Sequence, residues 1–377
     1  MKALLVGALL LGNMITNNVN QKPKLADPQA TLETQALFSN LKAISQRGIL
    51  FGHQHATEYG RGWAGDEDRS DVKSVVGSHP AVIGVDFSGL SGRSPADIER
   101  EKQRLRKTIV HTYNRGGVIT ISWHAPNPVH GGGFYAKKEG QQNSVKELLA
   151  GGSHHNQFIT ILADIADLVK SCIGKDGKSV PMIFRPWHEL DGEWFWWGDK
   201  HCTPTEIKAL YQLTVSELRD TNQVHNLLYA FSPDCRFLTE SKFLERYPGD
   251  EWVDMVGFDD YSDFGRDKYD LVNGLRKLKI VSDYAKKTGK LAAFTETGLE
   301  GIPNTTWWTE TLLKTLKSPG LELSYVLVWR NDTNSPTHYY APVPGHVSVS
   351  DFLKFYQDPF TLFEKDLKDI YHFPPSR

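Results

Sequence analysis

Eight short apolar or β-branched runs recur along the chain and constrain its fold more than any other feature. Nearly continuous apolar runs are typical of parallel strands that are buried on both faces. Segments with helical periodicity, such as Ala96–Asn114, Phe158–Cys172 and Asp267–Thr288, separate the runs. Strands that alternate with helices in this way predict an α/β fold, a (β/α)8 TIM barrel. The eight runs are Ile49–Gly52, Ala81–Phe87, Val118–His124, Met182–Glu189, Leu227–Asp234, Met255–Tyr261, Leu291–Gly298 and Leu323–Arg330.

Further segments complete the helical pattern. Thr203-Pro204-Thr205-Glu206 is a capping box with proline at the first helical position, and it opens a helix expected to reach about Arg219. Thr305–Lys317, Ser350–Gln357 and Pro359–Tyr371 also read as helices. A doubly wound sheet is the alternative, but it usually needs fewer strands, and the chain has no P-loop sequence that would mark a nucleotide crevice. The 377 residues suit one barrel with loop insertions, and two ordinary domains are the competing expectation.

The N-terminal segment is typical of an export signal. Lys2 precedes the apolar run Ala3–Leu11, which is shorter than the about 20 residues that span a bilayer. We expect a signal peptide at 1–16, a polar linker at 17–30 and a single catalytic barrel at 31–377 in an exported, periplasmic or extracellular protein. Asn13 stands where a lipoprotein signal would place its cysteine, so lipidation is not supported. No other segment is apolar enough to cross a membrane.

Charge and composition exclude several classes of partner. The net charge of −2 gives no reason to expect nucleic acid or an anionic membrane, so a neutral partner fits better. Half of the ten tryptophans fall in or beside short motifs that carry Glu or His, and indole faces suit the C–H faces of sugars. The three cysteines, Cys172, Cys202 and Cys235, have neither zinc-site nor disulfide-framework spacing. Free buried thiols are favoured over a single disulfide.

Nearly every predicted strand ends in polar or aromatic residues. In TIM barrels the chemistry lies at the carboxyl ends of the strands, so these residues are expected to converge on one rim. Eight such ends together predict an active site. The ends are His53-Gln54-His55, Asp86, Ser122-Trp123-His124, Arg185-Pro186-Trp187-His188-Glu189, Ser232-Pro233-Asp234, Asp259-Asp260-Tyr261, Thr295-Glu296-Thr297 and Trp329-Arg330.

Two of these carboxylates decide the class of reaction. Glycosidic bond cleavage needs two carboxyl groups that flank one bond. Glu189 and Glu296 end strands four and seven, which face each other across the mouth of such a barrel. That relation favours carboxyl groups about 5–5.5 Å apart, hence double displacement with retention. Non-catalytic interpretations remain: Glu189 could be a salt-bridged surface residue, and Glu296 could be an acid at a helix N-terminus.

The motif around the first carboxylate resembles glycoside hydrolase family 26, whose best-known members are β-mannanases. The resemblance rests on the stretch from Arg185 to Gly198, RPWHELDGEWFWWG, which looks like the acid/base signature, and on Phe294–Gly298, FTETG, which looks like the nucleophile strand. It extends from Gly52 to Trp329-Arg330 and so covers most of the chain. It implies hydrolysis of β-1,4-mannosidic bonds in mannan, galactomannan or glucomannan, with Glu189 as acid/base and Glu296 as nucleophile.

The resemblance also implies roles for the residues around the two glutamates. His188 is expected to contact the sugar near its 2-hydroxyl or the nucleophile, and Tyr261 to hydrogen-bond the nucleophile. His124 is expected in the glycone-side subsite, Trp194 on the leaving-group side and Trp329 as the stacking floor. Asp259 and Arg330 are expected as further subsite contacts.

Several alternatives stay open at this point. The same family contains β-1,3-xylanases and mixed-linkage β-glucanases, and a non-catalytic carbohydrate-binding barrel or an unrelated hydrolase on this fold are rivals of another class. His53 and His55 are expected to be structural rather than metal ligands, and Asp259-Asp260 lacks a calcium-binding loop. We expect no required metal or organic cofactor, and a monomer that acts on β-mannan or manno-oligosaccharides. The long loop over residues 126–156 is expected to border the active face and to favour release of mannobiose.

Overall fold

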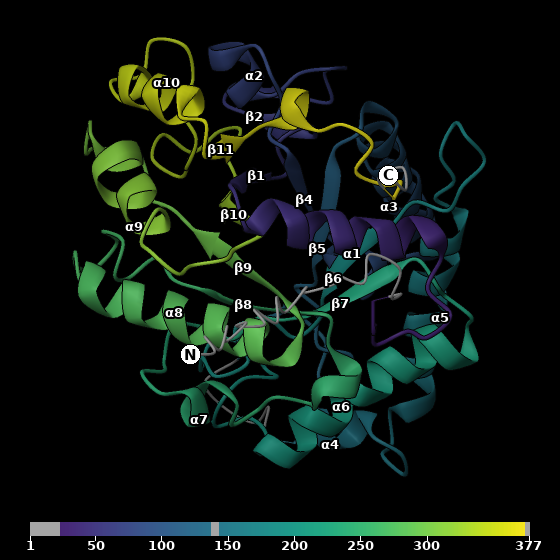
Figure 1. The fold of residues 1–377 in the computed structure, drawn as a ribbon. Helices are drawn as coiled ribbons and strands as arrows, with labels where there is room; N and C mark the ends of the chain where they lie inside the picture. The colour runs from purple at the N-terminus through teal and green to yellow at the C-terminus, as the bar shows by residue number, and fades with distance from the viewer. Residues whose placement is uncertain (1–22, 137–142, 374–377) are drawn as a thin grey trace, which may run out of the picture.

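The computed structural model describes residues 23–136 and 143–373, and within them eight parallel strands close into a barrel. Each strand pairs in parallel with the next along the chain, and the last, β10, pairs with β1 to complete the ring. The predicted (β/α)8 TIM barrel is therefore confirmed (Figure 1). The barrel strands are β1 (Ile49–Gln54), β4 (Val82–Asp86), β5 (Val118–Ser122), β6 (Met182–Arg185), β7 (Leu227–Phe231), β8 (Met255–Asp259), β9 (Leu291–Thr297) and β10 (Tyr325–Val328).

Every residue of these eight strands is buried, because side chains fill the barrel on one face and helices cover the other. This explains why the strands read as continuous apolar runs in the sequence. All eight predicted runs contain a strand. Several strands end earlier than predicted, and the residues after them form the rim of the barrel.

The helices follow the sequence signals closely where capping residues are present. Helix α6 (Pro204–Ser216) begins at the predicted capping box of Thr203 and Glu206, and a π-helical turn over Glu217–Thr221 continues it. The larger helices that surround the barrel are α3 (Pro95–Arg115), α5 (His155–Ser171) and α8 (Leu271–Thr288). Shorter helices are α2 (Asp71–Val76), α4 (Ser144–Leu148), α7 (Glu240–Phe243), α9 (Lys314–Leu316) after a π-helical segment Trp307–Leu313, and α10 (Val349–Gln357).

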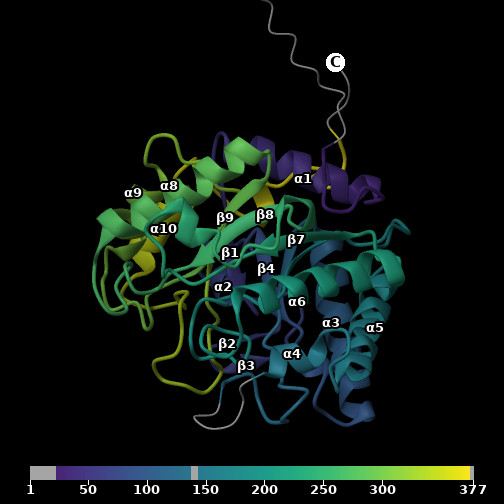
Figure 2. The same cartoon turned by 90° about the horizontal axis from the view of Figure 1, so that it is seen from below.

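The amino ends of the strands are covered by helix α1 (Leu32–Ser45), which contacts β1, β7 and β9. Figure 2 shows α1 at one end of the molecule, while the β2–β3 hairpin (Tyr59–Gly60 and Trp63–Ala64) and α4 lie at the opposite end. That opposite end is where the strands finish. The predicted helical pattern did not include α1.

Residues 23–30 differ from the expectation of a polar linker. Ala26 and Asp27 are buried, and the Ala26 N–H donates to Asp254 Oδ1 at 2.7 Å. The described part of the predicted linker is therefore held against the barrel, because it covers apolar surface beside α1. The predicted signal peptide at 1–16 and the rest of the linker lie outside the described residues.

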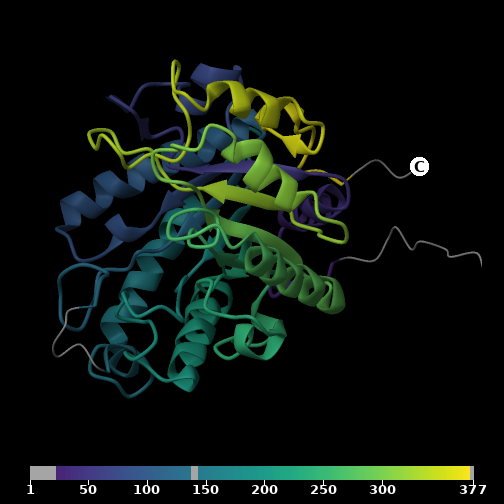
Figure 3. The same cartoon turned by 90° about the vertical axis from the view of Figure 1, so that its left-hand side faces the viewer.

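The predicted helix Pro359–Tyr371 is wrong. Strand β11 (Thr361–Leu362) pairs in parallel with the start of β1, and only a short 3-10 turn follows at Glu364–Asp366. Phe363 packs on the Phe51 ring, so the segment is extended in order to reach this part of the core. Figure 3 shows the yellow C-terminal part of the chain beside the purple and blue N-terminal part, and α10 contacts α2 there.

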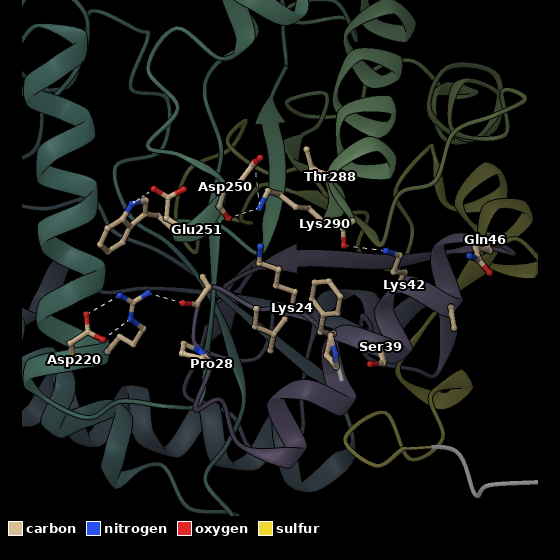
Figure 4. Close-up of a pocket in the computed structure, with 18 residues that line it drawn as sticks. Lys24, Pro28, Ser39, Lys42, Gln46, Asp220, Asp250, Glu251, Thr288 and Lys290 are labelled. Carbon is tan, nitrogen blue, oxygen red and sulfur yellow. Dashed lines mark hydrogen bonds and ion pairs between the residues drawn. The ribbon is translucent and has the colours of Figure 1, made fainter. Parts of the chain in front are cut away.

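A cavity of about 1230 Å³ lies at the α1 end of the barrel, away from the strand ends that were predicted to carry the chemistry (Figure 4). Several of its charged side chains are paired with the protein. Lys42 donates to the Gly289 carbonyl at 3.1 Å, and Lys290 donates to the Asp250 carbonyl at 2.6 Å. The size of this cavity is therefore no argument for catalysis. In the part of the chain that the structure describes, no helix has the length and apolar character needed to cross a membrane.

Candidate active site

Three carboxylates from three strand ends meet at the mouth of the barrel. One oxygen each from Glu189, Asp259 and Glu296 lies within 4.8 Å of the other two. Glu189 follows β6, Asp259 ends β8 and Glu296 lies in β9. The barrel thus brings the predicted pair together across 107 residues of sequence. Asp259 was predicted from the sequence only as a sugar contact.

The backbone after β6 adopts a rare conformation that presents Glu189 to the mouth. Pro186 has no N–H, so the β ladder stops at Arg185. Trp187 (φ 57°) and Glu189 (φ 51°) then take left-handed conformations, which cost non-glycine residues energy and recur at active sites. The Glu189 N–H donates to the Ser232 carbonyl at 2.8 Å, and Trp187 Nε1 donates to Thr214 Oγ1 at 3.0 Å. Neighbouring elements therefore hold this turn in place.

A bulge aims Glu296 into the barrel. Phe258 pairs with Phe294 and Asp259 pairs with Glu296, so Thr295 is an extra residue in β9. Bulges commonly redirect a side chain beside an active site. Here Thr295 donates to Asp259 at 2.7 Å and Glu296 contacts Arg185. The bulge therefore lets two successive side chains both point into the barrel.

Arg185 was predicted only as part of a strand end, and no role of its own in the site was expected from the sequence. Its guanidinium donates to Glu296 Oε1 through Nη2 and to Asp259 Oδ1 through Nη1, the latter at 3.1 Å. Burial alone would lower the pKa of Arg185, but the two carboxylates outweigh burial and raise it, so the cation is stable there. The available signal was an arginine at the end of an otherwise apolar strand, because a buried guanidinium must be paired.

The two glutamates have opposite environments. Glu296 accepts from Arg185 and from the Tyr261 hydroxyl, at 3.0 Å, so a cation and a second donor stabilise its charge. Glu189 accepts only from Trp194 Nε1, at 2.6 Å, among the described residues. Burial, followed by the charges of Asp259, Glu296 and Asp234, raises the pKa of Glu189 well above its ordinary value. The site thus pairs a carboxyl group that holds a proton with a carboxylate beside a cation.

Asp259 lies beneath the site instead of lining it. Its side chain is fully buried, and it accepts from Ser232 at 3.0 Å and from Thr295 as well as from Arg185. The predicted sugar contact is therefore corrected: Asp259 has no exposed atoms to offer and positions Arg185. The three carboxylates are close enough for a metal ion, yet the Arg185 guanidinium already compensates two of them.

Two predicted histidines meet on the other side of Glu189. His188 Nε2 and His124 Nε2 lie 3.2 Å apart, and His124 Nδ1 bonds to Asp86 Oδ2 at 2.6 Å. His188 is buried, whereas His124 is half-buried, so His124 has the more accessible ring. Burial, with the charges of His124 and Arg185, lowers the pKa of His188 well below its ordinary value, so this ring is neutral.

The barrel and its paired carboxylates match a known family. The model of glycosyl hydrolase family 26 matches residues 26–362. The chain belongs to glycosyl hydrolase family 26. The chain is 41% identical to a GH26 β-mannanase from Bacteroides ovatus, with a TM-score of 0.85 over 92% of this chain and 99% of that one. It is 37% identical to GH26C from Muricauda sp., with a TM-score of 0.87 over 94% of this chain and 97% of that one.

Two curated relatives are both named mannan endo-1,4-beta-mannosidase, and one of them is much longer than this chain. A mannan endo-1,4-beta-mannosidase from Bifidobacterium adolescentis is 35% identical over 90% of this chain, which spans only 35% of that relative's length. A mannan endo-1,4-beta-mannosidase from Bacillus subtilis is 26% identical and is matched over 86% of its length.

Trp329 and Arg330 lie at the mouth of this family 26 barrel, after β10. The centroid of the Trp329 ring is 5.7 Å from that of the His124 ring. The backbone N–H of Trp329 donates to the Thr297 carbonyl at 3.1 Å. Trp329 is half-buried, so part of its ring is open to the mouth. Arg330 forms an ion pair with Asp332 at 2.7 Å. Trp329 therefore belongs to the same group as His124, while Arg330 lies farther along the rim.

Most of the tryptophans near the motif belong to the core. Trp123, Trp187, Trp196 and Trp197 are fully buried, so the expectation that this cluster stacks sugars is wrong for them. They support the loop instead: Trp196 Nε1 donates to the Ala125 carbonyl at 2.8 Å and Trp197 Nε1 to the His188 carbonyl at 2.9 Å. Trp194 and Trp329, the two tryptophans for which individual sugar contacts were predicted, are half-buried.

The remaining histidines and cysteines of the motifs have structural surroundings. His53 is buried at the end of β1, and burial lowers its pKa to about 4. His55 pairs with Glu58 and stacks on Tyr59. All three cysteines are free thiols, as the sequence analysis favoured, although only Cys172 is fully buried.

The single hydrogen bond to Glu189 yields a prediction. Trp194→Phe keeps an aromatic ring but removes the N–H that stabilises the carboxylate form, a donor that lowers the pKa of Glu189. We expect the pKa of Glu189 to rise by up to about one unit, which is the size of a typical net hydrogen bond. The alkaline limb of the profile of kcat/KM against pH should move upward by the same amount.

The matched control is Trp252→Phe, because Trp252 Nε1 also donates to a glutamate, Glu251, at 3.1 Å, but at the α1 end of the barrel. Trp252→Phe should leave the alkaline limb in place. A downward shift for Trp194→Phe would contradict the assignment.

Proposed function

We propose that this family 26 chain is a mannan endo-1,4-β-mannosidase that hydrolyses β-1,4-mannosidic bonds in mannan, galactomannan or glucomannan by double displacement. Glu296 is the nucleophile and Glu189 is the acid/base. The observation that carries the proposal is the contrast between the two carboxyl groups. Arg185 and Tyr261 donate to Glu296, whereas no cation pairs with Glu189 among the described residues, and burial raises the pKa of Glu189. The substrate named for the Bacteroides ovatus, Bifidobacterium adolescentis and Bacillus subtilis relatives supports mannan.

The first step follows from these protonation states. Glu296 attacks the anomeric carbon while the Glu189 carboxyl group gives its proton to the departing glycosidic oxygen, so the C–O bond to the leaving sugar breaks. The Tyr261 hydroxyl and the Arg185 guanidinium donate to Glu296 and hold its carboxylate in place until it attacks. The product of this step is a covalent ester between Glu296 and the mannosyl unit.

The second step uses the charge change at Glu296. In the ester Glu296 is neutral, so one of the charges that raise the pKa of Glu189 is gone. Glu189, which lost its proton in the first step, then stays ionised long enough to take a proton from water. That water attacks the ester and releases a product with the original configuration.

The spacing of the carboxyl groups supports retention. One oxygen of Glu189 lies within 4.8 Å of one oxygen of Glu296. Retaining enzymes keep the groups about 5–5.5 Å apart, whereas inverting enzymes need about 6.5–9.5 Å to admit a water molecule. The shorter distance leaves no room for water between the group that attacks and the sugar.

The residues around the pair take the following proposed places. Trp329 stacks the reacting sugar from below, and His124 lines the glycone side of the bond, with the buried His188 behind it. Trp194 both orients Glu189 and borders the leaving-group side. Arg330 contacts a sugar farther out on the glycone side.

A hydrolysis panel tests the substrate. We expect reducing ends to appear from galactomannan and glucomannan, and β-configured products to be the first formed when the reaction is followed by proton NMR. Lichenan and β-1,3-xylan serve as the competing substrates. Faster hydrolysis of either one would overturn the mannan assignment, and α-configured first products would overturn double displacement.

The raised pKa of Glu189 predicts a substrate-dependent pH profile. The protonated form is active in the first step, so kcat/KM for mannohexaose should fall about tenfold per pH unit above that pKa and be constant just below it. An aryl β-mannoside with a good leaving group needs no proton from Glu189. Its kcat/KM should therefore lack this alkaline limb, and an identical limb for both substrates would contradict the assignment of Glu189.

A further inference from the structure

We propose that Asp86 is a positioning residue that fixes the proton positions of the histidine pair beside the reacting sugar. It does so by holding the proton of His124 on Nδ1, so that Nε2 of His124 accepts and Nε2 of His188 donates. The inference rests on the proposed function, because it assigns the pair to the sugar-binding mouth of a mannan hydrolase. It concerns a residue at the end of β4, two barrel strands from β6 and three from β9.

Each oxygen of the Asp86 carboxylate accepts two hydrogen bonds. Oδ2 accepts from Ser122 Oγ at 2.7 Å and from His124 Nδ1 at 2.6 Å, and Oδ1 accepts from the Ser88 N–H at 2.7 Å and the His124 N–H at 3.2 Å. Burial would raise the pKa of Asp86, but His124 and Ser122 outweigh burial and lower it. A carboxylate can only accept, so the hydrogen in the bond to His124 resides on Nδ1 of the imidazole.

One proton therefore lies between the two Nε2 atoms. They are 3.2 Å apart, which allows a single N–H···N bond and excludes two facing N–H groups. A His124 ring that carries its single proton on Nδ1 accepts at Nε2, and His188 then donates from Nε2.

The surroundings of His188, the last member of the hydrogen-bonded series Asp86–His124–His188, favour the direction in which His188 donates to His124. His188 Nδ1 is buried without a partner among the described atoms, and it carries a lone pair if Nε2 holds the proton. The reverse direction would leave a buried N–H without an acceptor and would add a cation on His124 near Arg185. Orphaned buried N–H groups are the rarer and more costly defect.

The direction of the hydrogen bond between the two histidines decides what His124 offers to a bound sugar. His124 is the half-buried member, and its ring lies 4.7 Å from Phe134 and 5.7 Å from Trp329, measured between centroids. The single lone pair of His124 Nε2 accepts from a sugar hydroxyl only when that hydroxyl displaces the His188 N–H, which is then free to donate to the sugar. With the opposite tautomer the same hydroxyl would meet an N–H, and the hydroxyl would have to turn away from its other partners.

Asp86→Asn tests the inference with almost no change of shape. The asparagine amide donates instead of accepting, so the His124 proton moves to Nε2. We expect kcat/KM for mannohexaose to fall about 10- to 100-fold, the effect of losing one hydrogen bond to a charged group, with part of the loss in kcat. Asp27→Asn is the matched control, because Asp27 is buried and bonds to His225 Nδ1 at 2.9 Å at the opposite end of the barrel.

Nitrogen-15 NMR of labelled histidine gives a readout that is independent of activity. The wild-type spectrum should show His124 protonated on Nδ1 and His188 on Nε2, assigned with His124→Gln and His188→Gln. Asp86→Asn should show His124 protonated on Nε2. The opposite wild-type tautomers overturn the inference without any need for the variant to fold.

Two results separate this inference from the proposed function. Wild-type protein that does not hydrolyse mannan defeats the proposed function, while the tautomers are still read in the absence of substrate. Folded Asp86→Asn with wild-type kcat/KM, or an equal loss in Asp27→Asn, defeats the inference and leaves the proposed function standing.

Discussion

Glu296→Ala should lower kcat on galactomannan by at least about 10⁴-fold, and azide should restore turnover of an activated aryl β-mannoside. The reason is geometric. Alanine leaves a space at the point from which Glu296 attacks, and azide that enters this space attacks the anomeric carbon from the same face. The product should be the α-mannosyl azide, inverted relative to the β-glycosidic bond and identified by proton NMR.

The control for Glu296→Ala is a glutamate outside the site. Glu251 is exposed at the α1 end of the barrel, and Glu251→Ala should keep wild-type rates without azide. Unchanged activity of folded Glu296→Ala would remove Glu296 from the mechanism. Recovery with azide that yields the β-azide would assign the attacking position to another residue.

Glu189→Ala should separate substrates by their leaving groups. On galactomannan we expect a loss of about 10²- to 10⁴-fold, the usual contribution of a general acid. With a 2,4-dinitrophenyl β-mannoside the first step should stay within about tenfold of wild type, because that phenolate leaves without a proton. The second step is then slow, since no base activates water, so a burst of phenolate should precede slow turnover.

Azide distinguishes this variant from Glu296→Ala. Here azide needs no base and intercepts the ester on Glu296, so it should accelerate turnover and give the β-mannosyl azide. An equal loss on both substrates would contradict the role of Glu189 as acid/base. Retained rates on galactomannan would contradict it more directly.

The barrel could be predicted because each strand shows its burial in its own short apolar run, and such runs repeat along the sequence. Strands that are buried on both faces must be apolar throughout, and runs such as Val118–His124 record this directly. The rim could be predicted for a similar reason, since polar groups that follow a buried strand have to reach the open end of the barrel. Glu189, Glu296, Tyr261 and Trp329 were all located in this way or through the family resemblance.

The parts that the sequence did not reveal depend on contacts between distant residues. Arg185 belongs to an apolar strand, and nothing near it in sequence shows that its partners are Asp259 and Glu296, 74 and 111 residues away. Asp259 looked like a sugar contact for the same reason, because its complete burial follows from packing. Asp86 was recorded as a strand end, and its bond to His124 needs the register of β4 beside β5.

The errors have the same origin. The segment Pro359–Tyr371 has helical spacing, yet the edge of β1 and the aromatic pocket around Phe51 hold it extended. Tryptophans near a catalytic motif resemble sugar platforms, yet three neighbouring rings, Trp187, Trp196 and Trp197, pack on one another at centroid distances of 5.3–5.7 Å. Tertiary packing overrides the local pattern in both cases.

The left-handed backbone at Trp187 and Glu189 has a consequence for protein engineering. Each of these residues pays a conformational penalty on the order of 1–2 kcal/mol that glycine would not. Selection for heat resistance alone is therefore biased toward replacing Glu189, whose substitution relieves backbone strain and a buried carboxyl group together. A thermostability screen of this barrel has to score hydrolysis in the same assay, because one position where a substitution relieves strain is the acid/base of the proposed mechanism.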